Sequence, residues 1–132
     1  MKKIFLITLI LLLQSFPSYS EWTFVVKGNN GQTFNYVDLK RIRTDKDFKY
    51  FWSLMDLNEK NKFGIQSYLT FFKVECKLLR YKFLTQQRFE TNMGKGQPIE
   101  IIPSEPNEEK VKWRYPKPNG MIEKILNRVC DY

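Results

Sequence analysis

Apolar and charged side chains alternate with a period of two in the middle of this sequence. Phe72, Val74 and Cys76 would share one face of an extended segment, whereas Lys73 and Glu75 would share the other face. An apolar face has to be covered by a core, while a charged face can meet solvent, and this combination is typical of antiparallel strands. The pattern therefore predicts a β-strand here, with the Cys76 side chain pointing into the core.

Other segments extend this sheet in both directions along the chain. In residues 48–57 both alternating sets are largely apolar, which predicts a strand covered on both faces in the middle of the sheet. Further strands, rich in aromatic and β-branched residues and separated by turns that contain Gly, Asn or Asp, are predicted at residues 22–26, 32–37, 79–88 and 99–102.

The basic residues of segment 79–88 also follow the alternation. Arg80, Lys82 and Arg88 are expected to point outward, opposite the apolar residues of the same strand. A tight connection to residues 68–77 would give a hairpin, but the two segments could also form one long bent strand.

The period changes near the C-terminus. Ile122, Ile125, Leu126 and Val129 recur at i, i+3, i+4 and i+7, which is the apolar stripe of an amphipathic helix, and Asn119 is a plausible N-cap. A helix of this kind buries its stripe against a sheet. The predicted fold class is therefore α+β, with a small antiparallel β-sheet packed by a C-terminal α-helix.

The first residues have the composition of a secretory signal. Two lysines precede a short apolar run at residues 4–13, which is too brief to span a bilayer, and Pro17 and Ser20 follow it. Cleavage after Ser20 would remove residues 1–20 and leave 112 of the 132 residues as a single domain, residues 21–132. The alternative is an uncleaved N-terminal anchor. No cysteine lies near the cleavage site, so the expected product is exported without a lipid, to the periplasm, the medium or the cell surface.

Cys76 and Cys130 are the two cysteines of the chain. Export would place them in an oxidising compartment, where one intramolecular disulfide is the simplest expectation. Closing a loop of 54 residues, from 76 to 130, would restrict the unfolded chain by about 4 kcal/mol. A bridge would also fix the predicted C-terminal helix on the inner face of the sheet. The chain contains no histidine, so neither a metal site nor a cofactor is expected.

The lack of histidine also removes the commonest general base, and a bridged cysteine pair leaves no thiolate nucleophile. An enzyme is therefore not expected. The net charge of +8, or about +6 once Lys2 and Lys3 are removed, favours anionic partners, although it can also serve ordinary solubility. Lys40, Arg41, Arg43 and Lys46 form the densest basic group and are the candidate contact for an anionic partner, with a solvated loop as the alternative. Export makes nucleic acid an unexpected partner.

Several short motifs follow one another along the chain. They are Trp22, Tyr36-Val37-Asp38 with Ile42, Trp52-Ser53-Leu54 with Asp56, Ser67-Tyr68-Leu69, Glu75-Cys76-Lys77 with Arg80 and Tyr81, Met93-Gly94-Lys95-Gly96, and Trp113 before a short helix ending in Cys130. In this order they resemble the surface-adhesin protein E family of Gram-negative bacteria, over nearly the whole of residues 21–132.

The resemblance implies the same sheet and helix with bridged cysteines. It also implies a non-enzymatic binding protein, because the family takes its name from adhesins that attach to host extracellular-matrix and plasma proteins. The alternative function is that of a periplasmic envelope-maintenance or stress protein that binds another envelope macromolecule.

Overall fold

The structure, a computed structural model of the chain, describes residues 21–103 and 107–132. The predicted signal peptide at residues 1–20 lies outside these residues. No helix within the described part is long and apolar enough to cross a membrane.

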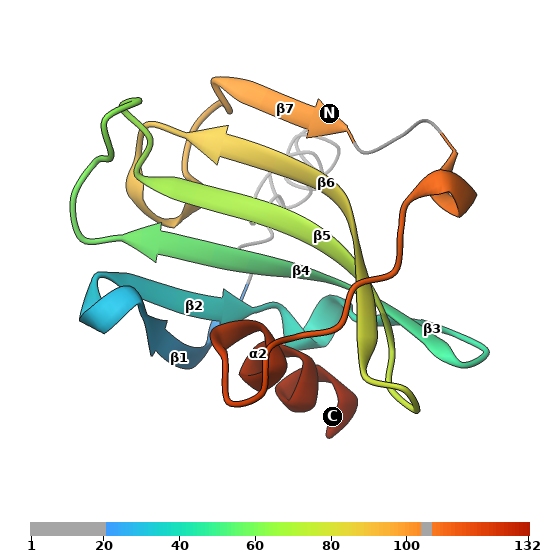
Figure 1. Cartoon of the computed structure of the whole chain (residues 1–132). Coiled ribbons are helices and arrows are strands. Elements are labelled where there is room, and N and C mark those ends of the chain that lie inside the picture. The colour runs from blue at the N-terminus through green and yellow to red at the C-terminus, as the bar shows by residue number, and fades with distance from the viewer. Residues whose placement is uncertain (1–20, 104–106) are drawn as a thin grey trace, which may run out of the picture.

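Within the described residues, seven strands form a single antiparallel sheet in the order β1-β2-β4-β5-β6-β7 (Figure 1). The short strand β3 lies off this order and pairs with the beginning of β4, whereas β2 pairs with its end. The strands are β1 (Thr23–Gly28), β2 (Thr33–Val37), β3 (Arg43–Asp45), β4 (Phe48–Leu57), β5 (Ser67–Glu75), β6 (Arg80–Phe89) and β7 (Glu100–Pro103). The apolar segment 48–57 forms β4 and lies in the interior of the sheet, as its composition predicts. The segments on either side of residue 78 form the β5–β6 hairpin, so the alternative of one long bent strand is wrong.

The register between β4 and β5 divides the side chains between two faces. Phe51 is opposite Phe72, and their rings stack with centroids 5.1 Å apart on the face that packs against the helix α2 (Met121–Cys130). We call this the helix face. Tyr50 is opposite Lys73 on the other side, which we call the outer face.

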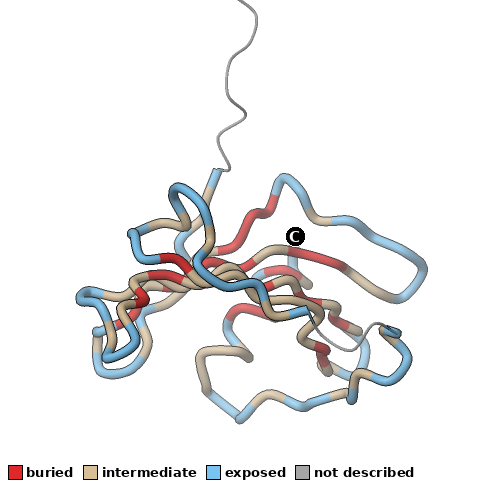
Figure 2. The backbone as a smooth tube through the Cα atoms, turned by 90° about the horizontal axis from the view of Figure 1, so that it is seen from above, coloured by how far each residue is buried: buried red, intermediate tan, exposed pale blue. Residues whose placement is uncertain are grey.

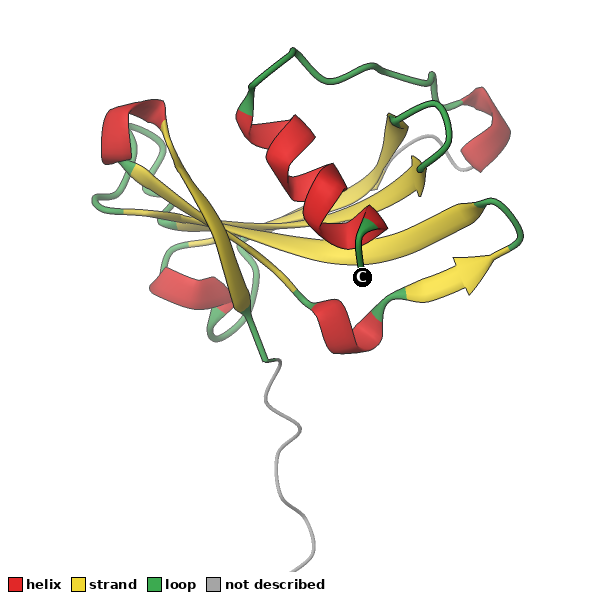
Figure 3. Cartoon of the chain, turned by 90° about the horizontal axis from the view of Figure 1, so that it is seen from below, coloured by secondary structure: helices red, strands yellow, loops and turns green. Residues whose placement is uncertain are grey.

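The core lies between the helix face and α2, and Figure 3 shows α2 crossing that face of the sheet. Most buried residues belong to the strands and α2, while most loop residues are exposed (Figure 2). The buried core residues are Val37, Leu39, Phe51, Phe72, Val74, Tyr81, Ile125, Leu126 and Val129. The alternating strands and the i, i+3, i+4, i+7 stripe of the helix thus meet in one core, as the periods predict.

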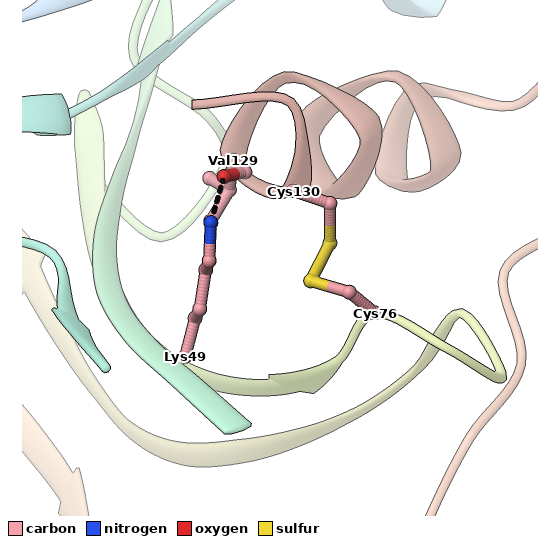
Figure 4. Close-up of a disulfide and its surroundings, with 4 residues drawn as sticks. All are labelled: Lys49, Cys76, Val129 and Cys130. Carbon is pink, nitrogen blue, oxygen red and sulfur yellow. Dashed lines mark hydrogen bonds between the residues drawn. A yellow bond between two sulfur atoms is a disulfide. The ribbon is translucent and has the colours of Figure 1, made fainter. Parts of the chain in front are cut away.

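A disulfide and a hydrogen bond tie the last turn of α2 to the sheet (Figure 4). Cys76, directly after β5, is bridged to Cys130 with Cα atoms 5.7 Å apart. Lys49 of β4 donates from Nζ to the main-chain oxygen of Val129 at 3.2 Å. Because the last carbonyls of a helix have no partner within the helix, this cation stabilises the C-terminal end of α2.

Two local predictions are wrong. The N-cap of α2 is Gly120 rather than Asn119, which adopts a φ of 60° and donates its main-chain N–H to the Glu123 carboxylate. Arg88 does not share a face with Arg80, because the β5–β6 register shifts at residues 71 and 72. A bulge changes which residues of β6 point to each face, and a strict period of two cannot foresee it.

Candidate functional site

The four basic residues selected from the sequence are all exposed and lie between the end of β2 and the start of β4. Lys40 and Arg41 belong to the single turn Leu39–Arg41, Arg43 begins β3, and Lys46 occupies the β3–β4 turn with a φ of 55°. The structure therefore places them in one region of the chain, within a short helical turn and the hairpin that follows it.

Acidic neighbours already engage two of these cations. Lys40 pairs with Glu21, whose hydrogen bond and charge raise the pKa of the Lys40 ammonium above its ordinary value. Arg41 pairs with the carboxylate of Asp38, which is itself buried. Exposed ion pairs of the Lys40 type contribute little to stability, so a stronger acidic ligand could replace Glu21 at small cost.

Arg43 connects this basic region to the outer face of the sheet. Its guanidinium carbon lies 4.3 Å from the ring centroid of Tyr50. Tyr50 is buried in β4, opposite Lys73 of β5. A guanidinium stacked on an aromatic face is held in place and keeps its outer N–H groups available for an anion.

Beyond Tyr50, cations and aromatic rings gather on the outer face in a group that the sequence did not single out. We call it the cation–aromatic cluster, and its members are Phe48, Tyr50, Lys73, Arg80, Lys82 and Trp113. The rings of Phe48 and Trp113 stack at 5.8 Å with an interplanar angle of 22°. Three strands, β4, β5 and β6, and one remote tryptophan therefore build a single site.

Lys73 occupies the middle of the cluster. Its Nζ lies 4.3 Å from the ring centroid of Phe48, 5.3 Å from that of Tyr50 and 5.8 Å from that of Trp113. The ammonium also pairs with the Glu108 carboxylate. Burial alone lowers the pKa of Lys73, but hydrogen bonds to Glu108 and Tyr50 and the charge of Glu108 outweigh it, and the pKa is raised.

The same contact acts on Glu108 in the opposite direction. The hydrogen bond from Lys73, partly offset by burial, lowers the pKa of the Glu108 carboxyl below its ordinary value. Both groups are therefore held in their charged forms at neutral pH.

Lys82 and Arg80 complete the cluster from β6. The Nζ of Lys82 lies 4.8 Å from the ring centroid of Trp113, and the Cζ of Arg80 lies 4.4 Å from it. Arg80 is also paired with Glu75 at 2.6 Å. Lys82 was expected to point into solvent, and it does lie on the outer face, but it is only 6% exposed. Its ammonium donates at 3.0 Å to the main-chain oxygen of Glu108, in the segment that returns over this face.

Trp113 reaches the cluster through a contact between distant parts of the chain. Tyr81 of β6 and Arg114 exchange main-chain hydrogen bonds of 2.9 and 2.8 Å, which fix the returning segment beside β6 (Figure 1). Alternation in the sequence already placed Lys73 and Arg80 on one face. No local pattern indicates that residues 107–114 would cover it, so the tryptophan could not be assigned from the sequence.

The arrangement has a positive excess and suits the binding of an anion. Lys73, Arg80 and Lys82 carry three charges, opposed by the two carboxylates of Glu75 and Glu108. Charge-assisted hydrogen bonds next to a partly desolvated aromatic surface are stronger than those in water. Within the described ranges, no group of three or more His, Cys, Asp and Glu side chains could hold a metal ion.

Among the hollows formed by the described residues, two lie away from the cluster. One of about 430 Å³ separates the β1–β2 turn from the loop after β4 and is lined by amides that include Asn29, Asn58 and Asn61. The other, of about 260 Å³, is more apolar and lies beside β6 and β7, where Phe83 and Ile102 contribute. Neither gathers the charges found on the outer face.

Comparison with known proteins agrees with this architecture. Solved structures of Haemophilus influenzae protein E are similar in fold: one crystal form has a TM-score of 0.63 at 15% identity, covering 86% of this chain and 89% of that chain. A structure of protein E from a non-typeable strain has a TM-score of 0.52 at 12% identity, covering 87% and 80%. A search of curated protein sequences finds no match. The family model for surface-adhesin protein E matches residues 22–131. The chain therefore belongs to the surface-adhesin protein E family, as the order of its sequence motifs indicates.

Proposed function

We propose that this chain is an exported, non-enzymatic binding protein of the surface-adhesin type, which contacts an acidic macromolecular partner through its outer face. Membership of the family supports the adhesive role. The observation that carries the choice of surface is the cation–aromatic cluster, continued by Arg43 toward the exposed Lys46. The partner class that fits best is an acidic protein of the extracellular matrix.

Both the charge of the chain and the restricted motion of its arginine side chains favour binding at this surface. The full chain has a net charge of +8, and without Lys2 and Lys3 the chain from Glu21 keeps about +6, which attracts acidic partners over a distance and raises the rate of encounter. Arg43 and Arg80 are already stacked on Tyr50 and Trp113. Because these side chains lose little rotamer freedom when a partner binds, their hydrogen bonds contribute more to affinity than those of mobile lysines.

The first test is a binding measurement with immobilised matrix proteins, using the oxidised chain that begins at Glu21. Replacing Arg43 and Lys46 by serine should weaken saturable binding about tenfold or more, because two charges leave the contact surface. The matched control replaces Lys60 and Lys62 by serine, in the loop at the opposite end of β4, with the same change in net charge. Equal losses in both double variants would mean that only overall charge matters and would contradict the proposed surface.

The second test concerns location. We propose that cleavage after Ser20 releases residues 21–132 as one domain, so N-terminal sequencing of the exported protein should begin at Glu21. Protease added to intact cells should degrade a surface adhesin. Protection until the outer membrane is permeabilised would instead favour the alternative, a periplasmic envelope-maintenance or stress protein.

A further inference from the structure

The cation–aromatic cluster already holds one glutamate of the chain itself. The Glu108 carboxylate pairs with the Lys73 ammonium and lies 3.4 Å from the Tyr50 hydroxyl, which donates to it. The main-chain oxygen of Glu108 accepts a hydrogen bond of 3.0 Å from Lys82. The cluster therefore contacts both the side chain and the backbone of a single glutamate residue.

The two lysines that hold this glutamate carry like charges at neighbouring positions of the sheet. Lys73 and Lys82 are directly opposite each other on β5 and β6. Like charges at such cross-strand positions destabilise a sheet, and Lys82 is nearly buried. The Glu108 carboxylate pairs with Lys73, and Lys82 donates to the main-chain oxygen of the same residue, so one glutamate offsets this repulsion. The strands therefore present a site that is complementary to a glutamate residue before any partner arrives.

The two sides of the contact differ in how firmly they are held. The lysines belong to the long paired strands β5 and β6, and the Lys73 side chain is 12% exposed. Glu108 belongs to the three-residue turn Glu108–Lys110, and its side chain is 39% exposed. The receiving groups are therefore fixed, while the glutamate is on a short segment and can be reached from solvent.

We propose that Lys73 and Lys82, with Tyr50, form a binding site for a glutamate residue of an acidic polypeptide partner, and that Glu108 occupies this site in the free protein as an internal competitor. The inference rests on the proposed function, since it names the chemistry by which the outer face recognises its partner. A polypeptide fits better than a sulfated glycan because Lys82 binds a main-chain carbonyl oxygen, a group that every peptide offers beside its side chain.

The test compares two neutral substitutions at adjacent positions. The probe is a dye-labelled hexaglutamate peptide, and its affinity is followed by fluorescence anisotropy at low ionic strength. Glu108→Gln removes the competitor, whereas Glu109→Gln removes the same charge from an exposed neighbour. If Glu108 fills the site nine-tenths of the time, Glu108→Gln should tighten binding about tenfold. Glu109→Gln should change it by less than about twofold.

Further variants separate competition from a purely structural ion pair. Adding Lys73→Gln to Glu108→Gln should abolish the gain in affinity. Glu108→Asp, which keeps the charge on a shorter side chain, should give an intermediate gain and serves as the second variant if Glu108→Gln does not fold.

Equal affinities of the Glu108 and Glu109 variants would overturn the inference, as would a gain for a sulfated hexasaccharide without one for the peptide. If Glu108→Gln shows no gain while the Arg43 and Lys46 variant still loses its matrix partner, the internal competitor is refuted and the proposed function stands. If the Arg43 and Lys46 variant keeps its partner while Glu108→Gln tightens peptide binding, the extension of the surface to Arg43 and Lys46 is refuted and the glutamate site stands.

Discussion

Removing the Cys76–Cys130 bridge tests how the helix is held on the sheet. The bridge joins the residue after β5 to the last residue of α2. Replacing both cysteines by serine breaks this connection and leaves no free thiol. The apolar contacts of α2 with the helix face remain, so the variant should fold to the same architecture with lower stability.

The size of the loss follows from the length of the loop. The bridged residues are separated by 54 positions, and restricting a loop of that length stabilises the folded state by about 4 kcal/mol in the chain-entropy model. For a domain of about this size, each kcal/mol corresponds to roughly 4 °C in Tm. The double variant should therefore unfold about 15 °C below the wild type.

Equilibrium unfolding in urea, followed by tryptophan fluorescence, measures the free energy directly. The oxidised wild type should exceed the double serine variant by about 4 kcal/mol. The wild type in excess reductant is the control, since it has the same sequence without the bridge and should behave as the variant does. A difference below about 1 kcal/mol, or a reduced wild type as stable as the oxidised one, would refute the clamp.

Three further predictions concern the core, one turn and the dependence of the free energy of unfolding on acidic pH. Leu126→Ala, at a fully buried position of α2, should cost about 2–5 kcal/mol in urea unfolding, and a loss below about 1 kcal/mol would contradict the packing of the helix. Gly94→Ala should lower the free energy of unfolding more than Gly96→Ala. Both glycines have a positive φ, but only a Cβ at residue 94 would meet a side chain of β5, that of Leu69 at 3.2 Å. Equal losses of stability would contradict this contact. Because Lys73 lowers the pKa of Glu108, protonating that carboxyl costs the folded state more than the unfolded state. The advantage of the wild type over Glu108→Gln should therefore be complete above the ordinary Glu pKa and shrink as the pH falls from about 5 to about 3; a gap independent of pH would contradict the pairing.

Much of the fold could be predicted because it follows from short-range periods. The alternation of Phe72, Lys73 and Val74 fixes the two faces of β5, and the stripe of α2 fixes which side of the helix is buried. The two cysteines then determine where the end of the helix must lie. The strand and helix patterns each lie within one element, and the disulfide depends only on the two cysteines.

Apart from the N-cap of α2 and the bulge that turns Arg88, the errors fall where a contact depends on residues far apart in the sequence. Lys82 was assigned to solvent because its strand alternates, yet it is buried under the returning segment. Trp113 joins the cluster only because Tyr81 and Arg114 pair across 33 positions, from 81 to 114. The basic group at Lys40 was visible as a local run of charge, whereas the cluster is assembled from separate strands and has no such run.

The most direct test of the binding surface is a titration of the oxidised, ¹⁵N-labelled chain from Glu21 with the hexaglutamate peptide, followed by NMR. The indole N–H of Trp113 reports on the cluster, that of Trp52 on the middle of β4 and that of Trp22 on the residue before β1. We expect the Trp113 signal and the main-chain amides of Lys73 and Lys82 to shift together and to saturate at one peptide concentration. Saturating shifts confined to Trp22 or to the loop at residues 58–61, with Trp113 unchanged, would contradict the account.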